Sequence, residues 1–350
     1  MYKRISIIGA GSWGTALAIL LAESSSSLPV FLWGRRATVV EELVSHRVNS
    51  IYLPKLRLPP NIYVTHQLAD ALDAKLILMV TPSKATREVA TQMAALGISP
   101  QSTLVSCTKG IEHDTGMLMS EVVVSCLPNN PLAVLSGPNH AIEVAKKFPA
   151  AAVVGSTNAE VLQDLQRDLF PPSFRLYTSE DVKGIQLGGA LKNIFAIAAG
   201  VSDGFGMGTN AKAALVTRAL TEMIRLGVSL GGKPETFCGL SGIGDLMGTC
   251  FSCHSRNRAI GERLGRGEAS IVIQNSMKMI AEGVPTARSA RQLAIRYSVE
   301  VPILEEVFQI LYNNKMPYKA LLELLGRRPR SESDFRCQST MQSFSNTSVV

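Results

Sequence analysis

The sequence predicts an α/β fold in its first half, built on a doubly wound sheet, followed by an all-α second half. A strand, glycine loop and helix open the chain, and short apolar runs then alternate with helical segments. Beyond about Asp181 the strand-like runs stop and long apolar-periodic stretches begin. We therefore expect domains at 1–182 and 183–328, and a polar, Ser-rich segment at 329–350 without regular structure.

The composition indicates a globular protein with a sizeable core, since 46% of its 350 residues are hydrophobic and 18% are charged. The net charge of +7 comes from scattered basic residues, and aromatic RNA-binding motifs are absent. We therefore expect small anionic ligands and no nucleic acid. No apolar run reaches the roughly 18 residues of a membrane-spanning helix, and glycines interrupt the apolar N-terminus. We expect a cytoplasmic protein without stable membrane insertion.

The opening unit is a strand, a glycine loop and a helix. Residues 3–8 form an apolar run that leads into Gly9-Ala10-Gly11-Ser12-Trp13-Gly14 and then a helical segment. Gly9 permits the turn, Gly11 leaves the backbone open to a pyrophosphate, and Gly14 lets the helix pack close to the strand. The free N–H groups at the helix start favour an anion. This pattern predicts a Rossmann-type dinucleotide site; the alternative is a merely structural turn.

Further strands are expected at 29–33, 75–80, 103–106, 132–135 and 150–155. Their alternation with helical segments predicts a parallel sheet covered on both faces. Ligands bind such sheets at the carboxyl ends of the strands. Residues directly after each strand are therefore the candidates for a binding site.

Two arginines, Arg35 and Arg36, follow the second strand. An Asp or Glu at this distance from the glycine loop would hold the ribose hydroxyls of NAD. Guanidinium groups instead match a 2′-phosphate. The sequence therefore predicts NADPH or NADH as the cofactor, with NADPH at least as good as NADH. The alternative is a solvated surface turn.

Three more polar turns follow strands, at 81–83, 107–110 and 136–141. Lys109 in the second turn can meet a phosphate or another substrate charge. The third turn, Ser136-Gly137-Pro138-Asn139-His140-Ala141, opens a helix and so offers an anion-accepting terminus. Each turn alone is compatible with an ordinary connection. Together, at one edge of a sheet, they predict a ligand site.

The second half is predicted to form helices at 183–201, 211–230, 255–264, 271–281, 286–297 and 302–312. The first of these is apolar nearly all round, which is typical of a buried helix. Lys192 lies in its middle, and burial lowers the pKa of a lysine. Such a lysine can donate a proton to a carbonyl oxygen as a hydride arrives. Its small neighbours, Gly188 and Gly189, leave room for a ligand; the alternative is a lysine that reaches the surface.

Three later segments are further candidates. Asp245, preceded by Gly242-Ile243-Gly244, either orients the lysine or caps a helix. Ser255-Arg256-Asn257 reads as a phosphate clamp at a helix start, or as a solvated basic turn. Glu282 can reach a cofactor ribose or amide, unless Glu282-Gly283 merely ends a helix.

A Cys250-x-x-Cys253-His254 pattern matches covalent haem attachment and could also seed a zinc site. No second Cys or His pair follows at zinc spacing. We interpret the pattern as a coincidence within a loop and predict no metal. The six cysteines are few and widely spread, which favours reduced thiols.

Taken together, the motifs between residues 3 and 326 are familiar. They are GAGSWGTALA, Trp33-Gly34-Arg35, Tyr52-Leu53-Pro54, residues 108–110, 136–138, 188–193, 203–215, 242–246 and 254–257, and Glu282-Gly283. In this order they resemble the bacterial NAD(P)-dependent glycerol-3-phosphate dehydrogenases. Members of that family reduce dihydroxyacetone phosphate to sn-glycerol 3-phosphate, which supplies phospholipid synthesis.

The resemblance implies a role for each matching residue. Lys192 matches the family's proton donor and acceptor. The implied cofactor contacts, beside the glycine loop, are Ser12, Trp13, Arg35, Arg36, Lys109, Ala141, Arg256, Ile280 and Glu282. The implied substrate contacts are Lys109, Gly137, Asn139, Lys192, Asp245, Ser255, Arg256 and Asn257. Asn139 departs from the Ser or Thr of many members, which changes only the hydrogen-bonding group.

Two other functions stay open from the sequence alone. One is a different two-domain Rossmann dehydrogenase that acts on a hydroxy acid, which would need a carboxylate clamp in place of Ser255-Arg256-Asn257. The other is a nucleotide-sensing protein without turnover, which would not need a buried Lys192 and Asp245. For the enzyme we expect a small-molecule substrate and a homodimer.

Overall fold

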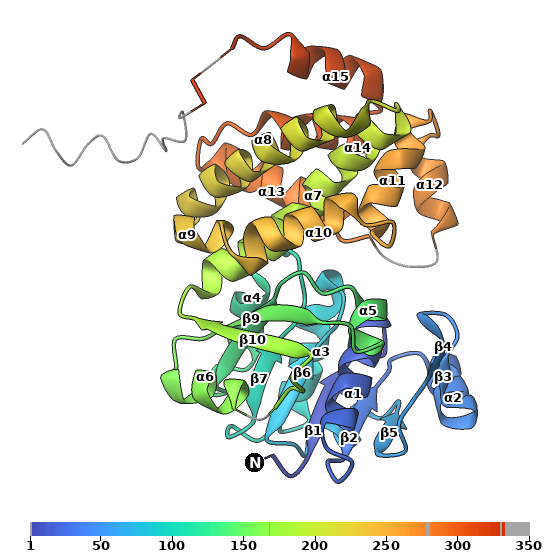
Figure 1. Cartoon of the computed structure of the whole chain (residues 1–350). Coiled ribbons are helices and arrows are strands. Elements are labelled where there is room, and N and C mark those ends of the chain that lie inside the picture. The colour runs from blue at the N-terminus through green and yellow to red at the C-terminus, as the bar shows by residue number, and fades with distance from the viewer. Residues whose placement is uncertain (1, 168, 278–280, 330, 333–350) are drawn as a thin grey trace, which may run out of the picture.

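The computed structural model describes residues 2–167, 169–277, 281–329 and 331–332 and consists of a sheet domain below a helical domain (Figure 1). Most of the expected segment 329–350 therefore lies outside the described residues. The sheet domain has the predicted doubly wound α/β fold. Its sheet contains β1 (Ile5–Ile8), β2 (Val30–Trp33), β5 (Ile62–Thr65), β6 (Leu76–Met79), β7 (Thr103–Ser106), β8 (Leu132–Ser136), β9 (Ala150–Gly155) and β10 (Phe174–Ser179).

The strand order is β10-β9-β8-β7-β6-β1-β2-β5. The chain runs outward from β1 in one direction through β2 to β5, and in the other from β6 onward, so the order reverses between β1 and β6. This reversal point is where ligands bind in open α/β sheets. The sequence predicted a parallel sheet, but β9 pairs antiparallel with β8, so the sheet is mixed. A separate two-stranded ribbon, β3 (Val48–Asn49) with β4 (Leu53–Arg57), lies beside it.

Helices cover both faces of the sheet. They are α1 (Ser12–Ser24), α2 (Ala37–His46), α3 (Thr86–Ala95), α4 (Met119–Cys126), α5 (Ala141–Ala145) and α6 (Ala159–Gln166). One apolar core joins the sheet to α1, α5 and α6, and a second joins the opposite face to α3 and α4. The strands β1 and β6 are buried throughout, as expected for a sheet covered on both sides.

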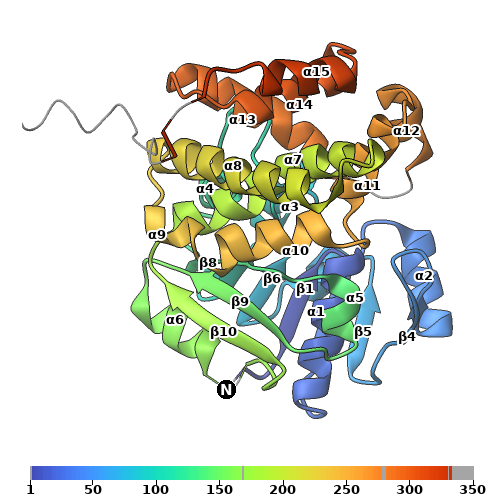
Figure 2. The same cartoon turned by 45° about the horizontal axis from the view of Figure 1, so that its top comes forward.

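The helical domain is arranged around α7 (Val182–Gly204), which Figures 1 and 2 show running through its centre. The other helices are α8 (Gly208–Ser229), α9 (Pro234–Phe237), α10 (Asp245–Phe251), α11 (Arg256–Gly265), α12 (Ser270–Ser276), α13 (Gly283–Arg296), α14 (Pro302–Tyr312) and α15 (Pro317–Leu325). A π-helical turn, Leu240–Gly244, precedes α10. Helix α12 is shorter than the predicted 271–281, and the prediction missed α15.

Helix α7 is apolar because it is a core helix. It is long and hydrophobic enough to span a membrane, but 94% of its most apolar stretch is buried inside the protein. Its closest neighbour is α11. A Cβ on Gly200 would lie 2.0 Å from the carbonyl oxygen of Arg258, and one on Gly261 would lie 1.9 Å from that of Ile197. Glycines on both helices therefore allow their backbones to touch.

Candidate active site

The glycine loop between β1 and α1 has the geometry that a pyrophosphate needs. Gly9 adopts a φ of +131°, and a Cβ on Gly14 would lie 1.8 Å from the carbonyl oxygen of Gly9, so both positions require glycine. A Cβ on Gly11 would meet nothing within 4 Å. No side-chain hydrogen bond caps the start of α1 among the described residues. The loop fits an anionic dinucleotide.

Residues predicted to contact the cofactor surround this loop. The Ser12 hydroxyl donates to the carbonyl of Tyr52 at 3.3 Å, and the Arg36 guanidinium donates to the Tyr52 hydroxyl. Arg35 is exposed and lies 3.6 Å from a carboxylate oxygen of Glu88. Trp13 is half-buried and packs with its ring centroid 6.4 Å from that of Phe174. Two guanidinium groups thus stand beside β2, close to the glycine loop.

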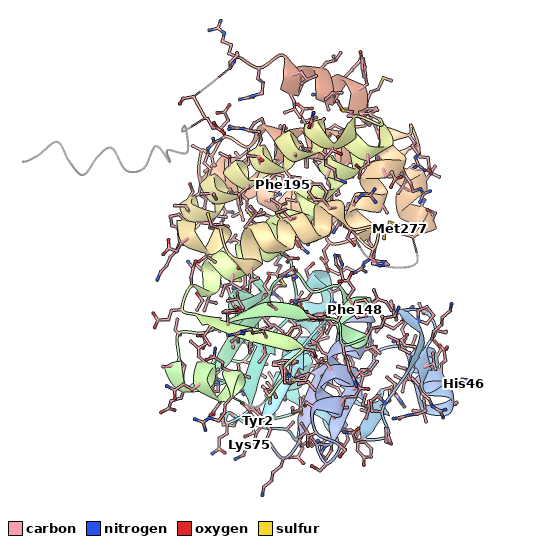
Figure 3. All side chains as sticks on the ribbon, in the orientation of Figure 1. Tyr2, His46, Lys75, Phe148, Phe195 and Met277 are labelled. Atoms are coloured by element: carbon pink, nitrogen blue, oxygen red, sulfur yellow. The ribbon has the colours of Figure 1, made fainter. Side chains whose placement is uncertain are left out.

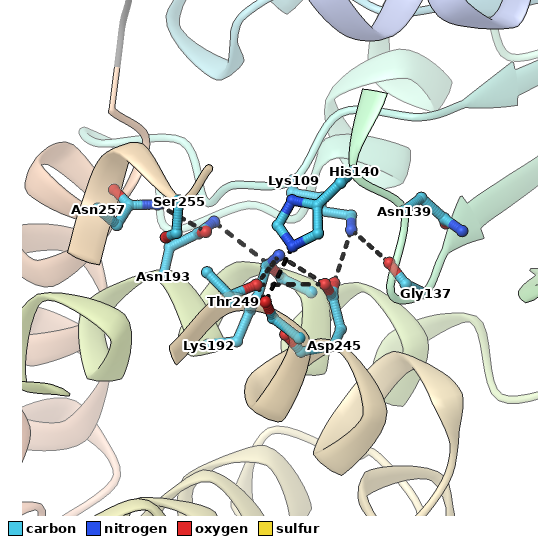
Figure 4. Close-up of polar contacts among 12 residues, drawn as sticks. Lys109, Gly137, Asn139, His140, Lys192, Asn193, Asp245, Thr249, Ser255 and Asn257 are labelled. Carbon is cyan, nitrogen blue, oxygen red and sulfur yellow. Dashed lines mark hydrogen bonds and ion pairs between the residues drawn. The ribbon is translucent and has the colours of Figure 1, made fainter. Parts of the chain in front are cut away.

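A buried ion-pair cluster joins the two domains (Figure 4). The Lys192 ammonium donates to Oδ1 of Asp245 at 2.6 Å, and the Lys109 ammonium donates to Oδ2 of the same carboxylate at 2.6 Å. Lys109 also donates to the carbonyl of Gly137 at 2.9 Å. Lys192 and Asp245 belong to the helical domain, and Lys109 belongs to the loop after β7. The predicted pairing of Asp245 with Lys192 is therefore present.

Lys192 is inaccessible rather than reaching the surface, since only 7% of the residue is exposed. This burial lowers the pKa of Lys192 to about 8, and the Asp245 carboxylate opposes the shift. A second partner, Thr249, accepts a hydrogen bond from the Lys192 ammonium at 2.6 Å. Thr249 lies one turn after Asp245 on α10, and its hydroxyl donates to the Asp245 carbonyl. The cluster thus fixes the ammonium with two hydrogen bonds.

The glycines beside Lys192 serve packing rather than making room for a ligand, which corrects the sequence-based interpretation. A Cβ on Gly188 would lie 2.5 Å from the carbonyl oxygen of Ser241, and one on Gly189 would lie 2.5 Å from the Ser136 hydroxyl. These close approaches bring α7 against the π-helical turn and against the end of β8. Lys192 is thereby placed at the sheet edge.

The turn after β8 reaches the same cluster. Gly137 has a φ of +146°, which favours glycine, and its carbonyl accepts from Lys109. The Asn139 amide nitrogen donates to the carbonyl of Ala151, while its oxygen is buried without a partner among the described residues. His140 contacts the Gly248 carbonyl at 2.9 Å. Ala141 begins α5, which packs against α1, the helix that follows the glycine loop.

The start of α11 departs in part from the predicted phosphate clamp. The Ser255 hydroxyl caps the helix by accepting from the N–H of Arg258. The Asn257 amide donates to Oδ1 of Asn193 at 2.8 Å and accepts from the N–H of Gly283 at 3.0 Å. Asn257 thus ties α11 to α7 and α13. The Arg256 side chain is exposed.

Glu282 bridges the two domains. Its carboxylate accepts from the backbone N–H of Ser83 at 3.0 Å and from the Ser83 hydroxyl at 2.5 Å. Burial raises the pKa of Glu282, and these hydrogen bonds oppose the rise. The alternative of a helix end here is wrong, because Glu282 immediately precedes α13. Ile280, predicted beside it, lies outside the described residues.

The Cys250-x-x-Cys253-His254 pattern forms no metal centre in the described part of the chain, where no group of three potential ligands occurs. Cys250 is buried and Cys253 is exposed. Burial raises the pKa of the Cys250 thiol to about 12, so this sulfur stays protonated near neutral pH. The two sulfurs therefore have different environments.

Comparison with known proteins assigns the family. The family model of the NAD-dependent glycerol-3-phosphate dehydrogenase N-terminus matches residues 4–162, and that of the C-terminus matches residues 181–322. The chain belongs to the NAD-dependent glycerol-3-phosphate dehydrogenases. The resemblance inferred from the motifs is therefore confirmed.

Relatives within this family match nearly the whole chain. The glycerol-3-phosphate dehydrogenase [NAD(P)+] of Geobacter sulfurreducens is 47% identical and aligns with 95% of this chain and 99% of its own. That of Bacillus cereus is 43% identical over 94% of this chain and 97% of its own. The crystal structure of glycerol-3-phosphate dehydrogenase from Coxiella burnetii has a TM-score of 0.89 and 41% identity, and covers 93% of this chain and 99% of that one.

Two residues that contact the predicted site residues were not expected from the sequence. Thr249 holds Lys192, and its one sequence signal is the spacing of four from Asp245, which places both on one face of a helix. Tyr52 meets both Ser12 and Arg36. Tyr52 lies in the turn between β3 and β4, and a single tyrosine in a short turn has no distinctive local pattern.

Proposed function

We propose that this chain reduces dihydroxyacetone phosphate to sn-glycerol 3-phosphate with NADPH or NADH, and that Lys192 supplies the proton. The observation that carries the proposal is the Lys109–Asp245–Lys192 cluster at the carboxyl edge of the sheet. When bound, the reduced nicotinamide supplies a hydride to the carbonyl carbon. The carbonyl oxygen then takes a proton from the Lys192 ammonium, which yields the alcohol.

Hydrogen-bond counting supports this role for Lys192. An ammonium has three donors, and the described contacts of Lys192 use two of them, on Asp245 and Thr249. One N–H therefore remains for a substrate oxygen. Because the pKa of Lys192 is about 8, the group is mostly protonated near neutral pH and gives up its proton readily.

Lys109 and Asp245 prepare the site electrostatically. Two ammonium groups share one carboxylate, so the cluster carries a net positive charge in a mostly buried setting. A positive charge fixed in place stabilises the alkoxide that develops as hydride arrives. Because Asp245 receives both lysines, it also holds them in a fixed relation across the domain junction.

The phosphate of the substrate needs a cation at the opposite end of the site. Arg256 is our candidate, because it is at the first position of α11, where the helix dipole is positive. Ser255 and Asn257 hold the helix start in place and contribute the hydroxyl proton and the second amide proton that their structural bonds leave free. A phosphate held there positions the carbonyl for reaction.

Two variants test these assignments in an assay of NAD(P)H absorbance with dihydroxyacetone phosphate. Lys192→Met should reduce kcat by at least about a thousandfold while cofactor affinity stays near that of the wild type, since general acid catalysis and charge are both lost. Arg256→Ala should raise KM at least about tenfold. Retained turnover in the first variant, or an unchanged KM in the second, would contradict the assigned role.

We also infer a homodimer that works in the cytoplasm. The apolar side chains of Tyr318, Leu322 and Leu325 recur on one face of α15 and are exposed, which suits burial against a second copy. The thiols described in the structure are unpaired, which fits a reducing compartment. Light scattering of the purified protein checks the dimer, and Leu322→Glu should weaken it.

A further inference from the structure

A second cleft lies at the junction of the two domains, outside the active site. One wall is the turn at residues 115–118 of the sheet domain. The facing wall is formed by the start of α7 and the ends of α8 and α13. The cavity volume is about 190 Å³. None of the residues lining it has a role in the reaction proposed above.

The chemistry of this cleft is amphipathic. Its floor is apolar and includes the buried side chains of Leu118, Leu187 and Leu293. Two cations, Lys183 and Arg296, are exposed at its rim. Neither side chain has a hydrogen bond or ion pair with another residue in the part of the chain that the structure describes. An apolar floor beside two unpaired cations is complementary to an anion that carries an apolar body.

The one carboxylate that lines the cleft forms no ion pair with these cations in the described part of the chain. Glu121 instead accepts a hydrogen bond from the N–H of Leu118 at 2.8 Å, within its own helix start. Lys183 lies in the first turn of α7, a helix of 23 residues, where the positive end of the helix dipole disfavours a cation. The Asp181 carboxylate already caps this helix start by accepting from the N–H of Gly184 at 2.9 Å, so a bound anion would be stabilised by the lysine itself.

We propose that this cleft is an effector site for a small amphipathic anion, a carboxylate with a short apolar chain. The carboxylate lies between Lys183 and Arg296, and the chain covers the leucine floor. A purely inorganic anion would leave the floor in water, and a neutral chain would leave the cations unpaired. The charged head and the apolar tail are therefore both required for affinity.

Both walls of the cleft are connected to the catalytic lysines. The turn at 115–118 closes the loop that starts at Lys109, through a bridge between Ile111 and Leu118 and a bond from the N–H of Glu112 to the carbonyl of Met117 at 2.9 Å. The opposite wall includes the start of α7, the helix that carries Lys192. An occupant that touches both walls biases how Lys109 and Lys192 face each other. This consequence rests on the proposed function; the binding itself does not.

The closing experiment uses octanoate as the probe, with acetate and 1-octanol as the head-only and tail-only controls. Binding is measured by titration calorimetry on the full chain without substrates. We expect octanoate to bind at least about tenfold more tightly than either control. The double variant Lys183→Gln/Arg296→Gln should lose about tenfold in octanoate affinity, because both charge-assisted contacts are removed.

Lys75→Gln is the matched control, since Lys75 is an exposed cation at the far end of the sheet domain (Figure 3). It should bind octanoate as the wild type does. In the same preparations, octanoate should change KM for dihydroxyacetone phosphate in the wild type and in the control, but not in the double variant. Octanoate binding that survives the double substitution, that is absent from the wild type, or that leaves KM and kcat unchanged would overturn the proposal. An inactive wild type that still binds octanoate would instead count against the proposed reaction.

Discussion

The replacement Asp245→Asn tests the electrostatic design of the active site through the pH dependence of the reaction. In the wild type, burial lowers the pKa of Lys192 to about 8, and the Asp245 carboxylate at 2.6 Å keeps it from falling further. With this pKa the ammonium fraction is about nine tenths at pH 7 and about one tenth at pH 9. Because ketone reduction consumes that proton, kcat should fall about tenfold per pH unit above pH 8.

Removing the carboxylate charge should move this alkaline fall in kcat to lower pH. An opposite charge at hydrogen-bond distance typically shifts a pKa by about one to three units, so Asp245→Asn should lower the pKa of Lys192 by at least about one unit. At pH 8 this costs roughly a further fivefold or more in the protonated fraction. Oxidation of glycerol 3-phosphate needs the neutral amine, so the pH at which the oxidation rate rises should also become lower.

The assay is the initial rate of NAD(P)H oxidation at saturating substrate across neutral to alkaline pH, with the reverse reaction measured in parallel. Glu305→Gln is the control, because Glu305 also forms an ion pair, at 2.7 Å with Arg291, but lies away from the site. Its pH profile should match that of the wild type. If Asp245→Asn lowers the rate but kcat still begins to fall at the wild-type pH, Asp245 does not control the proton affinity of Lys192 and the reasoning fails.

Three further predictions concern the cofactor loop and the core. Gly11→Ala should fold normally and lose cofactor affinity, whereas Gly14→Ala should lower Tm because its Cβ would meet a carbonyl oxygen at 1.8 Å; equal Tm values would contradict this. Replacing Arg35 and Arg36 by Ser should raise KM for NADPH about tenfold and leave that for NADH nearly unchanged; equal changes for both cofactors would remove the arginines from 2′-phosphate recognition. Burial raises the pKa of Glu222 from 4.5 to about 7, so the folded chain keeps a proton that the unfolded chain releases, and stability falls as pH rises through that interval. Glu222→Gln lacks this fall, so its Tm relative to the wild type should increase from pH 4.5 to 7; a constant difference would refute the shift.

The parts of the fold that were predictable are those with a strong local pattern. The strands β1, β2, β6, β7 and β8 are largely buried, so each is a short run whose only polar residues are Ser or Thr. Strands β5 and β10 at the sheet edges were missed. In β10 the exposed Arg175 and Thr178 interrupt the apolar run, and β5 is a four-residue strand whose Tyr63 is exposed. The orientation of β9 was also not predictable, since apolar periodicity carries no information on strand direction.

The candidate site was predictable residue by residue but not as an arrangement. Lys192 stood out because an ionisable group in an apolar helix is costly and needs a reason. Ser255 and Asn257 were marked for substrate, and the structure gives them bonds to the backbone of their own or neighbouring helices. A polar residue at a helix start can hydrogen-bond the backbone or a ligand with the same atoms. Residue type therefore cannot separate a structural role from a binding role.

The contacts that assemble the site join residues far apart in the chain, which is why local patterns could not reveal them. Glu282 and Ser83 are 199 residues apart, and Lys109 and Asp245 are 136 apart. Each of these contacts crosses the domain junction and pairs a buried polar group of one domain with a group of the other. Removing one partner of a buried charge pair is strongly unfavourable, so the bond from Lys109 to Asp245 favours the docked arrangement of the domains. The Asp245 carboxylate thus has two roles: one oxygen raises the pKa of Lys192 within the helical domain, and the other binds Lys109 across the junction. Its loss should therefore affect affinity for substrate as well as the proton step.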